Sequence, residues 1–182
     1  MKTNLASFNN SHYKPGAGRL KMTLWYLVNA LIINSFLPFG GLRASLLRLF
    51  GARVGTGVVL KPYINIKYPW NLEIGDHCWS GEQVWIDNLD KVQIGSHVCV
   101  SQGAMLLCGN HNYRISSFDL ITGPITLEDG VWIGAKTVVC PGIICHSHSV
   151  LSVGSVATRN LEAYTVYSGI PATAVRKREV KA

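Results

Sequence analysis

Hydrophobic residues recur at every sixth position along the C-terminal half of the chain. The clearest series is apolar and evenly spaced: Leu127, Ile133, Val139, Cys145, Leu151 and Ala157. A second set, mostly small or β-branched, follows each of these by four residues: Val131, Thr137, Ile143, Ser149, Ser155 and Leu161. A period of six fits neither an α-helix nor an ordinary alternating strand. It is typical of short strands joined by turns, each sending one aliphatic side chain into a shared core.

The same spacing occurs earlier in three more series. They are Val54, Leu60, Ile66 and Leu72, then Ile74, Ser80, Ile86 and Val92, and finally Ile94, Val100 and Leu106. The register slips by two residues between series, at 72 to 74 and at 92 to 94, as small insertions at a corner would produce. Three hexapeptides make one triangular coil, and stacked coils bury a continuous column of side chains. The pattern therefore predicts a solenoid of about five coils over residues 53–161. The hairpin turn signals that a sandwich of ordinary strands needs do not punctuate it.

An uncharged stretch of 18 residues, 22–39, precedes the repeats. Its length is at the lower edge of the roughly 20 apolar residues that span a bilayer, and Asn29, Asn34 and Ser35 interrupt it. We interpret it as a buried or interfacial helix that ends at Pro38. Packing on its own protein is the favoured interpretation, followed by peripheral membrane contact, with a full span the weakest.

The remaining segments complete the predicted organisation. Residues 40–50 predict an amphipathic helix ended by Gly51, with Arg43 and Arg48 outside and an apolar face made of Leu42, Leu46, Leu49 and Phe50. Residues 112–124 break the period of six and predict an excursion loop. We expect an N-terminal arm and helices over 1–52, the solenoid over 53–161, and a tail with a short helix over 162–182.

Composition narrows the classes of function. Hydrophobic residues make up 48% and charged residues 15%, which is typical of a packed globular protein. A formal charge of +7 favours an anionic partner, and part of it lies near the C-terminus at Arg176, Lys177, Arg178 and Lys181. No Lys/Arg run alternates with aromatic residues, so nucleic acid is not the expected partner.

Cysteine usage and the N-terminal residues bear on location. The chain has five cysteines and no C-x-x-C pair, which argues against a disulfide framework or a zinc site. The start of the chain has none of the features of a signal peptide. We therefore expect a reducing, cytoplasmic setting, at the inner face of the membrane if residues 22–39 touch it.

The repeat sequences also carry a family resemblance. IGDHCW, IGSHVC and VWIGAKTVVCPG, with the closing SGIPATAVRKR, resemble the hexapeptide-repeat acyltransferases, and among them the colanic acid biosynthesis acetyltransferases of the galactoside and maltose acetyltransferase group. The resemblance covers nearly the whole chain. It implies a left-handed parallel β-helix, a handedness that the spacing does not predict. It also implies acetyl-CoA as acyl donor and a homotrimer with the donor groove between two subunits.

His111, in the stretch CGNHNY, is the candidate catalytic residue. It ends the coil built on Ile94, Val100 and Leu106, where the excursion begins. Transfer of an acyl group to a hydroxyl needs a base, and imidazole titrates near neutral pH. The resemblance implies that His111 takes the hydroxyl proton while the oxygen attacks the thioester directly, with no covalent enzyme intermediate. The alternative is a loop histidine satisfied by a backbone carbonyl.

The other five histidines favour structural or exposed roles. His77 and His97 occupy the same slot of two repeats and are expected to stack at a turn, while His12 lies in the arm and His146 and His148 alternate in CHSHSV. Carbonic anhydrases built on the same fold bind metal through three converging histidines. The required spacing is absent here, so no metal site is expected.

Candidates for contacts to the acceptor are polar residues near the His111 coil. By resemblance a substrate-binding carboxylate falls at Asp87 or its neighbour Asn88, and Glu82 is a further candidate. Asp119 lies in the excursion, where it could reach the site or orient His111. Ser80 stands at a position where the family has asparagine, which leaves the acceptor open. Each of these could also be an ordinary turn residue.

The resemblance assigns contacts to acetyl-CoA as well. Ala135 and Val153 would offer backbone groups to the pantetheine arm. The phosphates would lie near Thr158, Arg159 and Arg176. Trp132 either walls the thioester channel or simply packs. Thr173 stands where the family has an arginine, so Lys177 is a possible substitute.

These observations predict an acetyl-CoA-dependent O-acetyltransferase acting on a sugar hydroxyl of a surface polysaccharide or its lipid-linked precursor. Two alternatives remain open: a metal-binding or scaffolding β-helix, and an acetyltransferase for another small acceptor such as an amino sugar or serine.

Overall fold

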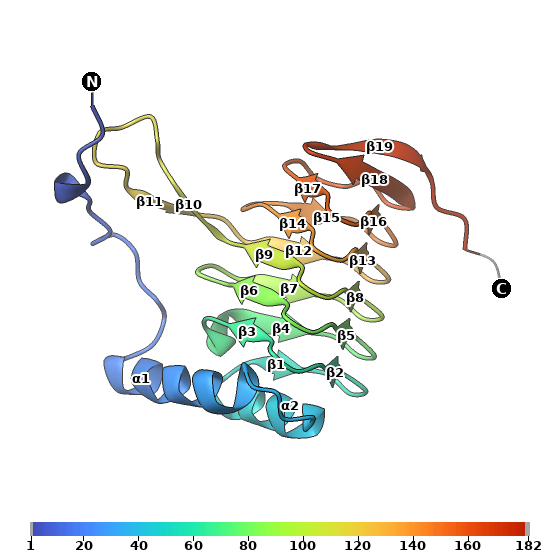
Figure 1. The fold of residues 1–182 in the computed structure, drawn as a ribbon, viewed down its shortest axis with the longest axis horizontal. Coiled ribbons are helices and arrows are strands. Elements are labelled where there is room, and N and C mark those ends of the chain that lie inside the picture. Colours follow the sequence, from blue (N-terminus) through green and yellow to red (C-terminus); the bar gives the residue numbers. More distant parts are fainter. Residues whose placement is uncertain (1, 181–182) are drawn as a thin grey trace.

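The computed structural model describes residues 2–180, so Lys181 and Ala182 lie outside the described residues. Short strands stack into a solenoid with three faces (Figure 1). Face 1 consists of β1 (Arg53–Val54), β4 (Leu72–Ile74), β7 (Val92–Ile94), β12 (Ile125–Leu127) and β15 (Ile144–Cys145). Face 2 consists of β2 (Val59–Leu60), β5 (Trp79–Ser80), β8 (Cys99–Val100), β13 (Trp132–Ile133), β16 (Val150–Leu151), β18 (Thr165–Gly169) and β19 (Ala172–Lys177). Face 3 consists of β3 (Asn65–Ile66), β6 (Trp85–Asp87), β9 (Met105–Leu107), β14 (Val138–Val139) and β17 (Val156–Ala157).

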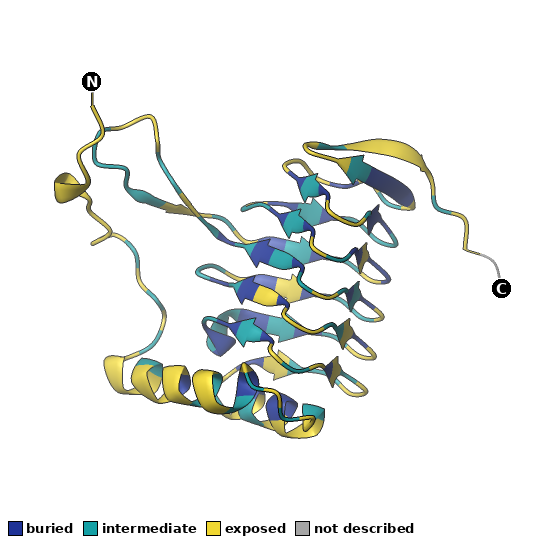
Figure 2. Cartoon of the chain, viewed as in Figure 1, coloured by how far each residue is buried: buried dark blue, intermediate teal, exposed yellow. Residues whose placement is uncertain are grey.

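The predicted repeat positions form three columns inside this solenoid. On face 3, parallel pairing aligns Ile66, Ile86, Leu106, Val139 and Ala157. On face 1 it aligns Val54, Ile74, Ile94, Leu127 and Cys145, and on face 2 Leu60, Ser80, Val100, Ile133 and Leu151. Nearly all of these side chains are buried (Figure 2). The solenoid predicted from the six-residue period is confirmed.

The register slips lie at corners, as predicted. Leu72 and Ile74 both belong to β4, and both are buried. Ile74, which pairs with Val54, holds the column position on face 1. The repeat therefore advances by eight residues from Ile66 to Ile74 instead of six. The extra residues form a 3₁₀ turn at Pro69–Asn71 between faces 3 and 1. The coil accommodates the extra residues at this corner because they lengthen only the turn, and the side chains of the flanking strands still point inward.

Two helices cover the base of the solenoid (Figure 1). α1 (Arg19–Val28) continues into a π-helical turn at Asn29–Ile33, and α2 (Gly40–Leu49) follows. Trp25 is fully buried, donates from Nε1 to the carbonyl of Ile66 at 2.9 Å, and packs on Phe50. The helix ends at residue 33 rather than at Pro38, because Asn34 leaves the helical region. None of the helices within residues 2–180 is long and apolar enough to cross a bilayer.

The predicted orientation of the second helix is right for Arg48, which is exposed, and for Leu46 and Phe50, which pack against the core, but it is wrong for the other predicted positions. Arg43, expected outside, is buried and donates to the carbonyls of Ile33 and Ser35 at 3.0 and 2.9 Å, while Leu42 and Leu49 are exposed. Carbonyls at the end of a helix lack partners within it. The guanidinium satisfies one such carbonyl, that of Ile33, and also the Ser35 carbonyl just beyond the helix, and its burial lowers the pKa of Arg43.

The short C-terminal helix is also wrong over the described residues. Residues 165–177 form β18 and β19, an antiparallel hairpin that extends face 2. β18 pairs with β16 and places Tyr167 opposite Leu151, which continues the inner column by one more strand. The open edge of face 2 offers hydrogen bonds that an isolated helix would forgo.

The excursion is itself a β-hairpin. β10 (Gly109–His111) and β11 (Leu120–Thr122) pair antiparallel and project from the solenoid (Figure 1). The N-terminal arm, with a 3₁₀ turn at Leu5–Ser7, lies along this hairpin: the Asn4 amide donates to the carbonyl of Ser116 at 2.8 Å. The arm therefore reaches across the molecule from α1 to the segment that carries His111.

Candidate functional site

His111 lies at the base of the excursion hairpin, half-buried. Its Nδ1 lies 2.9 Å from the carbonyl oxygen of Phe118. The ring stacks on that of Phe118 at 4.5 Å between centroids, and Phe8 of the arm approaches the ring at 5.8 Å. Because a carbonyl can only accept, Nδ1 carries the hydrogen and Nε2 carries the lone pair. The ring is thus held in one tautomer with its basic nitrogen left for a ligand.

The glycine two residues before this histidine has a steric reason. A Cβ placed on Gly109 would lie 2.5 Å from Cδ1 of Leu89, closer than real atoms approach. Any larger residue at position 109 would push the Leu89 side chain out of its present place. In the stretch CGNHNY, the glycine thus lies where the chain leaves the solenoid close to Leu89, and the histidine follows two residues later.

Asp119 does not orient the imidazole. Its Oδ1 accepts from the backbone amide of Asn9 at 3.1 Å, so it pins the arm to the hairpin. The group that orients His111 is the backbone carbonyl of Phe118, the residue before Asp119. The sequence interpretation that a backbone carbonyl satisfies His111 holds for one ring nitrogen, and it is compatible with a basic role for the other.

His111 and Asp87 line one hollow of about 470 Å³, here called the hairpin hollow. Its walls come from the arm, the corner after β6 and the excursion hairpin: Phe8, Asn10, Tyr13, Lys67, Tyr68, Asp87, Leu89, Gly109, Asn110, His111 and Leu120. Tyr13 donates its hydroxyl to the carbonyl of Leu89 at 2.8 Å. Burial and the nearby Asp87 raise the pKa of Tyr13, so the phenol stays protonated.

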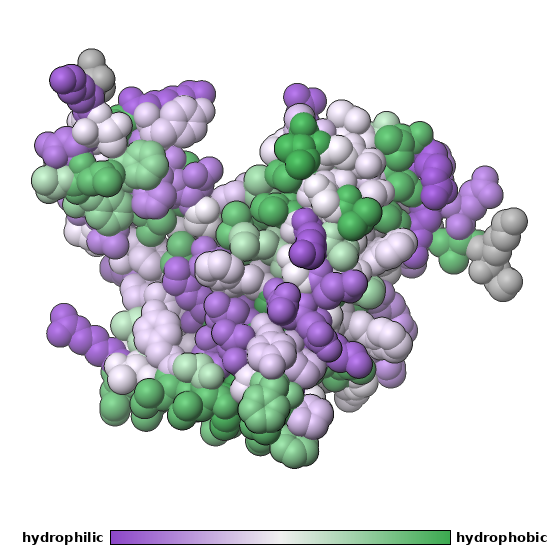
Figure 3. Space-filling view, viewed as in Figure 1, coloured by the Kyte–Doolittle hydropathy of each residue, from purple (hydrophilic) through white to green (hydrophobic). Residues whose placement is uncertain are grey.

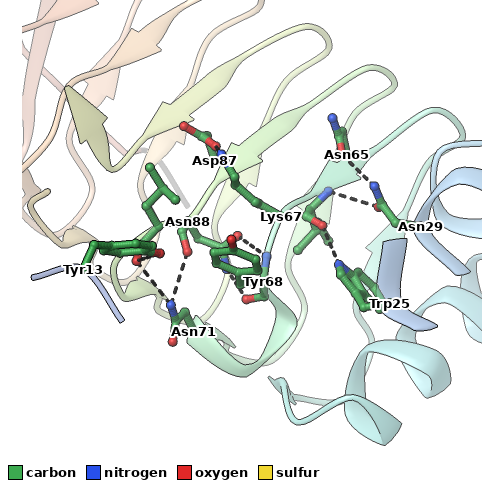
Figure 4. Close-up of polar contacts among 11 residues, drawn as sticks. Tyr13, Trp25, Asn29, Asn65, Lys67, Tyr68, Asn71, Asp87 and Asn88 are labelled. Atoms are coloured by element: carbon green, nitrogen blue, oxygen red, sulfur yellow. Dashed lines mark hydrogen bonds and ion pairs between the residues drawn. The ribbon is translucent and has the colours of Figure 1, made fainter. Parts of the chain in front are cut away.

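Asp87 supplies the negative charge of the hairpin hollow. Lys67 Nζ lies 3.0 Å from Asp87 Oδ1, as an ion pair on one side of the hollow (Figure 4). Asp87 Oδ1 is buried, and the Lys67 ammonium is its partner. A carboxylate has two oxygens that can each accept more than one hydrogen bond, so Asp87 keeps capacity for a ligand hydroxyl.

Asn88, the neighbouring candidate, points away from the hollow. Its side-chain amide is fully buried and pairs with the backbone of Tyr68: Oδ1 accepts from the Tyr68 amide at 2.9 Å, and Nδ2 donates to the Tyr68 carbonyl (Figure 4). These bonds close the corner between neighbouring coils. With both amide groups engaged, Asn88 has a structural role, and Asp87 is the candidate for ligand contact.

Glu82 is not brought near His111. It lines a separate hollow beside α2, together with Gly41, Val59 and Lys61. Ser80 points into the solenoid, where its hydroxyl is buried. Neither residue shares the hairpin hollow.

Four of the predicted donor-binding residues meet in a second hollow of about 680 Å³, here called the face 2 hollow. Trp132, Ala135, Val153 and Arg176 line it, and Trp132 donates from Nε1 to Ser101 Oγ at 3.0 Å. Four further wall residues have no donor-binding role predicted from the sequence: Ser101, Gln102, Arg178 and Glu179. Arg178 is held by the carbonyls of Gly130 and His148, at 2.9 and 3.1 Å.

Thr158 and Arg159 lie elsewhere. Both are exposed just after β17, outside the face 2 hollow. Lys177 points to the opposite side of β19 from Arg176 and donates to Thr165 Oγ1 at 3.0 Å. Alternation along a strand places Arg176 and Arg178 on one side and Lys177 on the other. This alternation is the signal that could have identified Arg178, had the tail been predicted as a strand.

Cys108 is the thiol nearest to His111 in sequence, and it is unsuited to attack an acyl group. It is fully buried, and desolvation raises its pKa to about 12. The nucleophile in cysteine chemistry is the thiolate, which is negligible at neutral pH for such a group. A Cys–His pair is therefore not what this site offers.

The other histidines have local partners. His77 and His97 stack at 5.3 Å, as predicted, His148 stacks on Tyr164, and His146 lies 2.9 Å from Glu128. Over residues 2–180, no three His, Cys, Asp or Glu side chains form a group that could hold a metal ion. The metal-binding alternative has no site in that part of the chain.

Comparison with known proteins decides the family. No family model matches the chain. The protein named "Putative colanic acid biosynthesis acetyltransferase WcaF" of Escherichia coli K12 is 35% identical over 164 residues, which are 90% of this chain and 90% of that protein. The chain belongs to the hexapeptide-repeat acetyltransferases. It is accordingly an enzyme of the acyltransferase class, which overrules the scaffolding alternative.

More distant members of the hexapeptide-repeat acetyltransferases agree. The galactoside O-acetyltransferase of E. coli K12 is 28% identical over 138 residues, 74% of this chain and 68% of that protein. A hexapeptide-repeat acetyltransferase of Vibrio cholerae, solved in complex with acetyl coenzyme A, superposes with a TM-score of 0.78 at 25% identity, over 89% of this chain and 87% of that chain.

Proposed function

We propose that this hexapeptide-repeat acetyltransferase transfers the acetyl group of acetyl-CoA to a sugar hydroxyl of a surface polysaccharide or its lipid-linked precursor, with His111 as general base. The observation that carries the proposal is the fixed His111 tautomer: Nδ1 is bound to the Phe118 carbonyl, and Nε2 is the nitrogen left to accept a proton. The ring shares its hollow with the Asp87 carboxylate, which can accept hydrogen bonds from a polyhydroxyl ligand.

The proton moves through His111. Acetyl-CoA, when bound, supplies the acyl group in activated form as a thioester. Nε2 takes the proton of the acceptor hydroxyl as the oxygen attacks, and the imidazolium then returns a proton to the departing thiolate. The Phe118 carbonyl stabilises the imidazolium through Nδ1 and keeps the ring oriented. Cys108 stays protonated and buried, which argues against it as a covalent nucleophile and supports direct transfer.

Asp87 is proposed to bind the acceptor. The named relatives act in colanic acid biosynthesis and on galactosides, which supports a sugar. Removing the charge by Asp87→Asn is expected to raise the acceptor KM by about 10- to 100-fold, since a hydrogen bond to a charged group contributes about 1.5–3 kcal/mol. Steady-state kinetics at saturating acetyl-CoA measure this.

Asp119→Asn is the matched control for that substitution. The amide oxygen can still accept from the Asn9 backbone, so the arm keeps its anchor. Acceptor KM and kcat should therefore change little. A large loss of kcat in Asp119→Asn would instead assign the orienting role to Asp119 and contradict the Phe118 carbonyl.

The face 2 hollow is proposed to hold acetyl-CoA. Arg176 and Arg178 offer cations for its phosphates, Ala135 and Val153 offer backbone groups to the pantetheine, and Trp132 flanks the channel. Thr158 and Arg159 do not line this hollow, so they are left out of the proposed donor site. The acetyl-CoA complex of the Vibrio cholerae relative supports the choice of donor.

Arg176→Ala is expected to weaken acetyl-CoA binding about 10-fold or more, because a charge-assisted phosphate contact is lost. The kcat at saturating donor should stay close to that of the wild type. Lys177→Ala is the matched control on the opposite side of β19. Calorimetry that shows equal losses for both variants would rule out the face 2 hollow as the donor site.

A homotrimer is proposed because the two hollows lie apart from each other within a single chain. The hairpin hollow and the face 2 hollow share no residue, and the excursion hairpin projects from the side of the solenoid away from β18 and β19 (Figure 1). Packing three copies around an axis would bring the hairpin hollow of one chain against face 2 of the next. The five free thiols suit the proposed cytoplasmic location.

Thiol release from acetyl-CoA in the presence of a panel of sugars tests the proposed function. Turnover with a sugar hydroxyl acceptor, and no acceleration by amino sugars or serine, is the expected result. Faster turnover with an amine acceptor would overturn the proposed O-acetylation in favour of N-acetylation.

A further inference from the structure

The outer side of the base carries a stripe of exposed leucines. Leu20, Leu24, Leu27 and Leu31 recur along α1 and the π-helical turn at spacings of three and four residues, which places them on one side. Their exposed fractions are 75%, 47%, 55% and 70%. The inward side of the same helix buries Trp25 and Ile33. This helix therefore has apolar residues on both sides, and only one side packs on the solenoid.

The apolar surface continues onto the linker and α2. Exposed large side chains there are Phe36, Phe39, Leu42 and Leu49. Together with the leucine stripe they form what is here called the basal patch. Figure 3 shows hydrophobic residues gathered along the base over the helices, and Figure 2 shows the outward side of these helices exposed. Contiguous apolar surface of this kind marks an interaction site.

The charge of the surrounding segment identifies the kind of partner. Residues 1–72 contain no Asp or Glu, and they contain nine of the 17 Lys and Arg residues: Lys2, Lys14, Arg19, Lys21, Arg43, Arg48, Arg53, Lys61 and Lys67. The remaining residues hold eight Lys and Arg against all ten Asp and Glu. The positive excess of the chain thus lies entirely in residues 1–72, which comprise the arm, the two base helices and the first coil. Within this segment Arg43 is buried, and Arg53 and Lys67 pair with Glu73 and Asp87.

We propose that the basal patch docks on an anionic phospholipid bilayer, with α1 lying in the interface and the solenoid standing off the surface. Leucines in one stripe would enter the acyl boundary, while Arg19 meets the headgroups, joined by Lys21 once its ammonium leaves the Trp70 ring over which it lies. A protein partner would need an apolar surface with acidic surroundings, whereas an anionic bilayer supplies both features at once. The helix is too short to span, which fits a surface location.

The docking geometry would serve an acceptor carried on a lipid. The arm that lines the hairpin hollow runs directly from the first turn of α1 to the excursion hairpin (Figure 1). The hairpin hollow thus lies on the side of the solenoid and is separated from the base by the height that the arm spans, so a lipid-carried acceptor would have to extend up from the membrane to reach it. Docking itself is independent of the proposed acetyl transfer, and its readout is binding, so either can fail without the other.

Co-sedimentation of the full chain with vesicles tests the docking. Wild type is expected to bind vesicles containing phosphatidylglycerol, to bind pure phosphatidylcholine far less, and to be released by salt. Leu27→Glu/Leu31→Glu should weaken binding by about 10-fold per leucine or more. Arg19→Glu/Lys21→Glu should weaken binding to anionic vesicles alone. Ile170→Glu, at an equally exposed site on the β18–β19 turn, is the control and should bind like wild type.

Three results would overturn the proposal. They are equal binding of the Leu27→Glu/Leu31→Glu variant and the wild type, no preference for anionic vesicles, and a shift of that variant to a smaller species in size-exclusion chromatography. The last would show that a second copy covers the patch. Thermal unfolding checks that the variant folds, since both leucines are exposed and make few internal contacts.

Discussion

His111→Ala is expected to lower kcat by about 10²- to 10⁴-fold, the usual contribution of a general base. The KM for acetyl-CoA should stay near the wild-type value, because the face 2 hollow contains no atom of His111. The physical reason is that a neutral hydroxyl attacks a thioester poorly unless its proton leaves as the new bond forms. Thiol release at saturating donor and acceptor measures the loss.

The control for this variant is another histidine with a defined local role. His77→Asn removes an imidazole that stacks on His97, and asparagine tolerates the positive φ of 56° at that position. Its kcat should be close to wild type. If His111→Ala retained most of its activity, another group would be taking the proton, and the role assigned to Nε2 would be wrong.

Leu106→Ala is expected to lower the free energy of unfolding by about 2–5 kcal/mol. Leu106 is fully buried in the face 3 column between Ile86 and Val139, in a core where each coil rests on its neighbours. Truncation leaves a cavity that strands fixed by parallel pairing on both sides cannot close. Denaturant unfolding followed by circular dichroism gives the difference.

Met105→Ala is the matched control, because it changes the adjacent residue of the same strand, whose side chain points outward and is only half-buried. Its loss of stability should be clearly smaller. Equal losses for the two variants would mean that the inner column is not the main source of stability in this coil.

Several features of the fold and the site were predictable from the six-residue period alone. The columns followed from spacing, since a six-residue repeat fixes strand length, turn length and the inward side chain within each coil. The stack of His77 on His97 followed from the same logic, because equal slots in successive coils lie above one another. The excursion followed from the break in the period, and His111 was located at its edge.

Neighbouring residues could not be told apart in this way. Asp87 and Asn88 are adjacent, and the pairing of Asp87 with Leu107 in β6 and β9, together with the buried corner at Tyr68, decides which one faces the hairpin hollow. Phe118 and Asp119 are likewise adjacent. The antiparallel register of His111 with Leu120 presents the carbonyl of Phe118, and not the carboxylate of Asp119, to the imidazole.

What the sequence by itself determined is the repeating solenoid, the break that carries His111 and the family resemblance, because all three are written in local, periodic patterns. What only the tertiary structure decided depends on partners far away in the chain. Arg43 turns inward because the Ile33 carbonyl at the end of the first helical segment and the Ser35 carbonyl just beyond it lie beside its guanidinium. The tail becomes a strand because face 2 ends in an open edge, and Arg178 joins Arg176 because of that strand. The period of the repeat predicts which side chains each coil buries. Contacts between polar groups that are distant in the sequence can be located only in the folded structure.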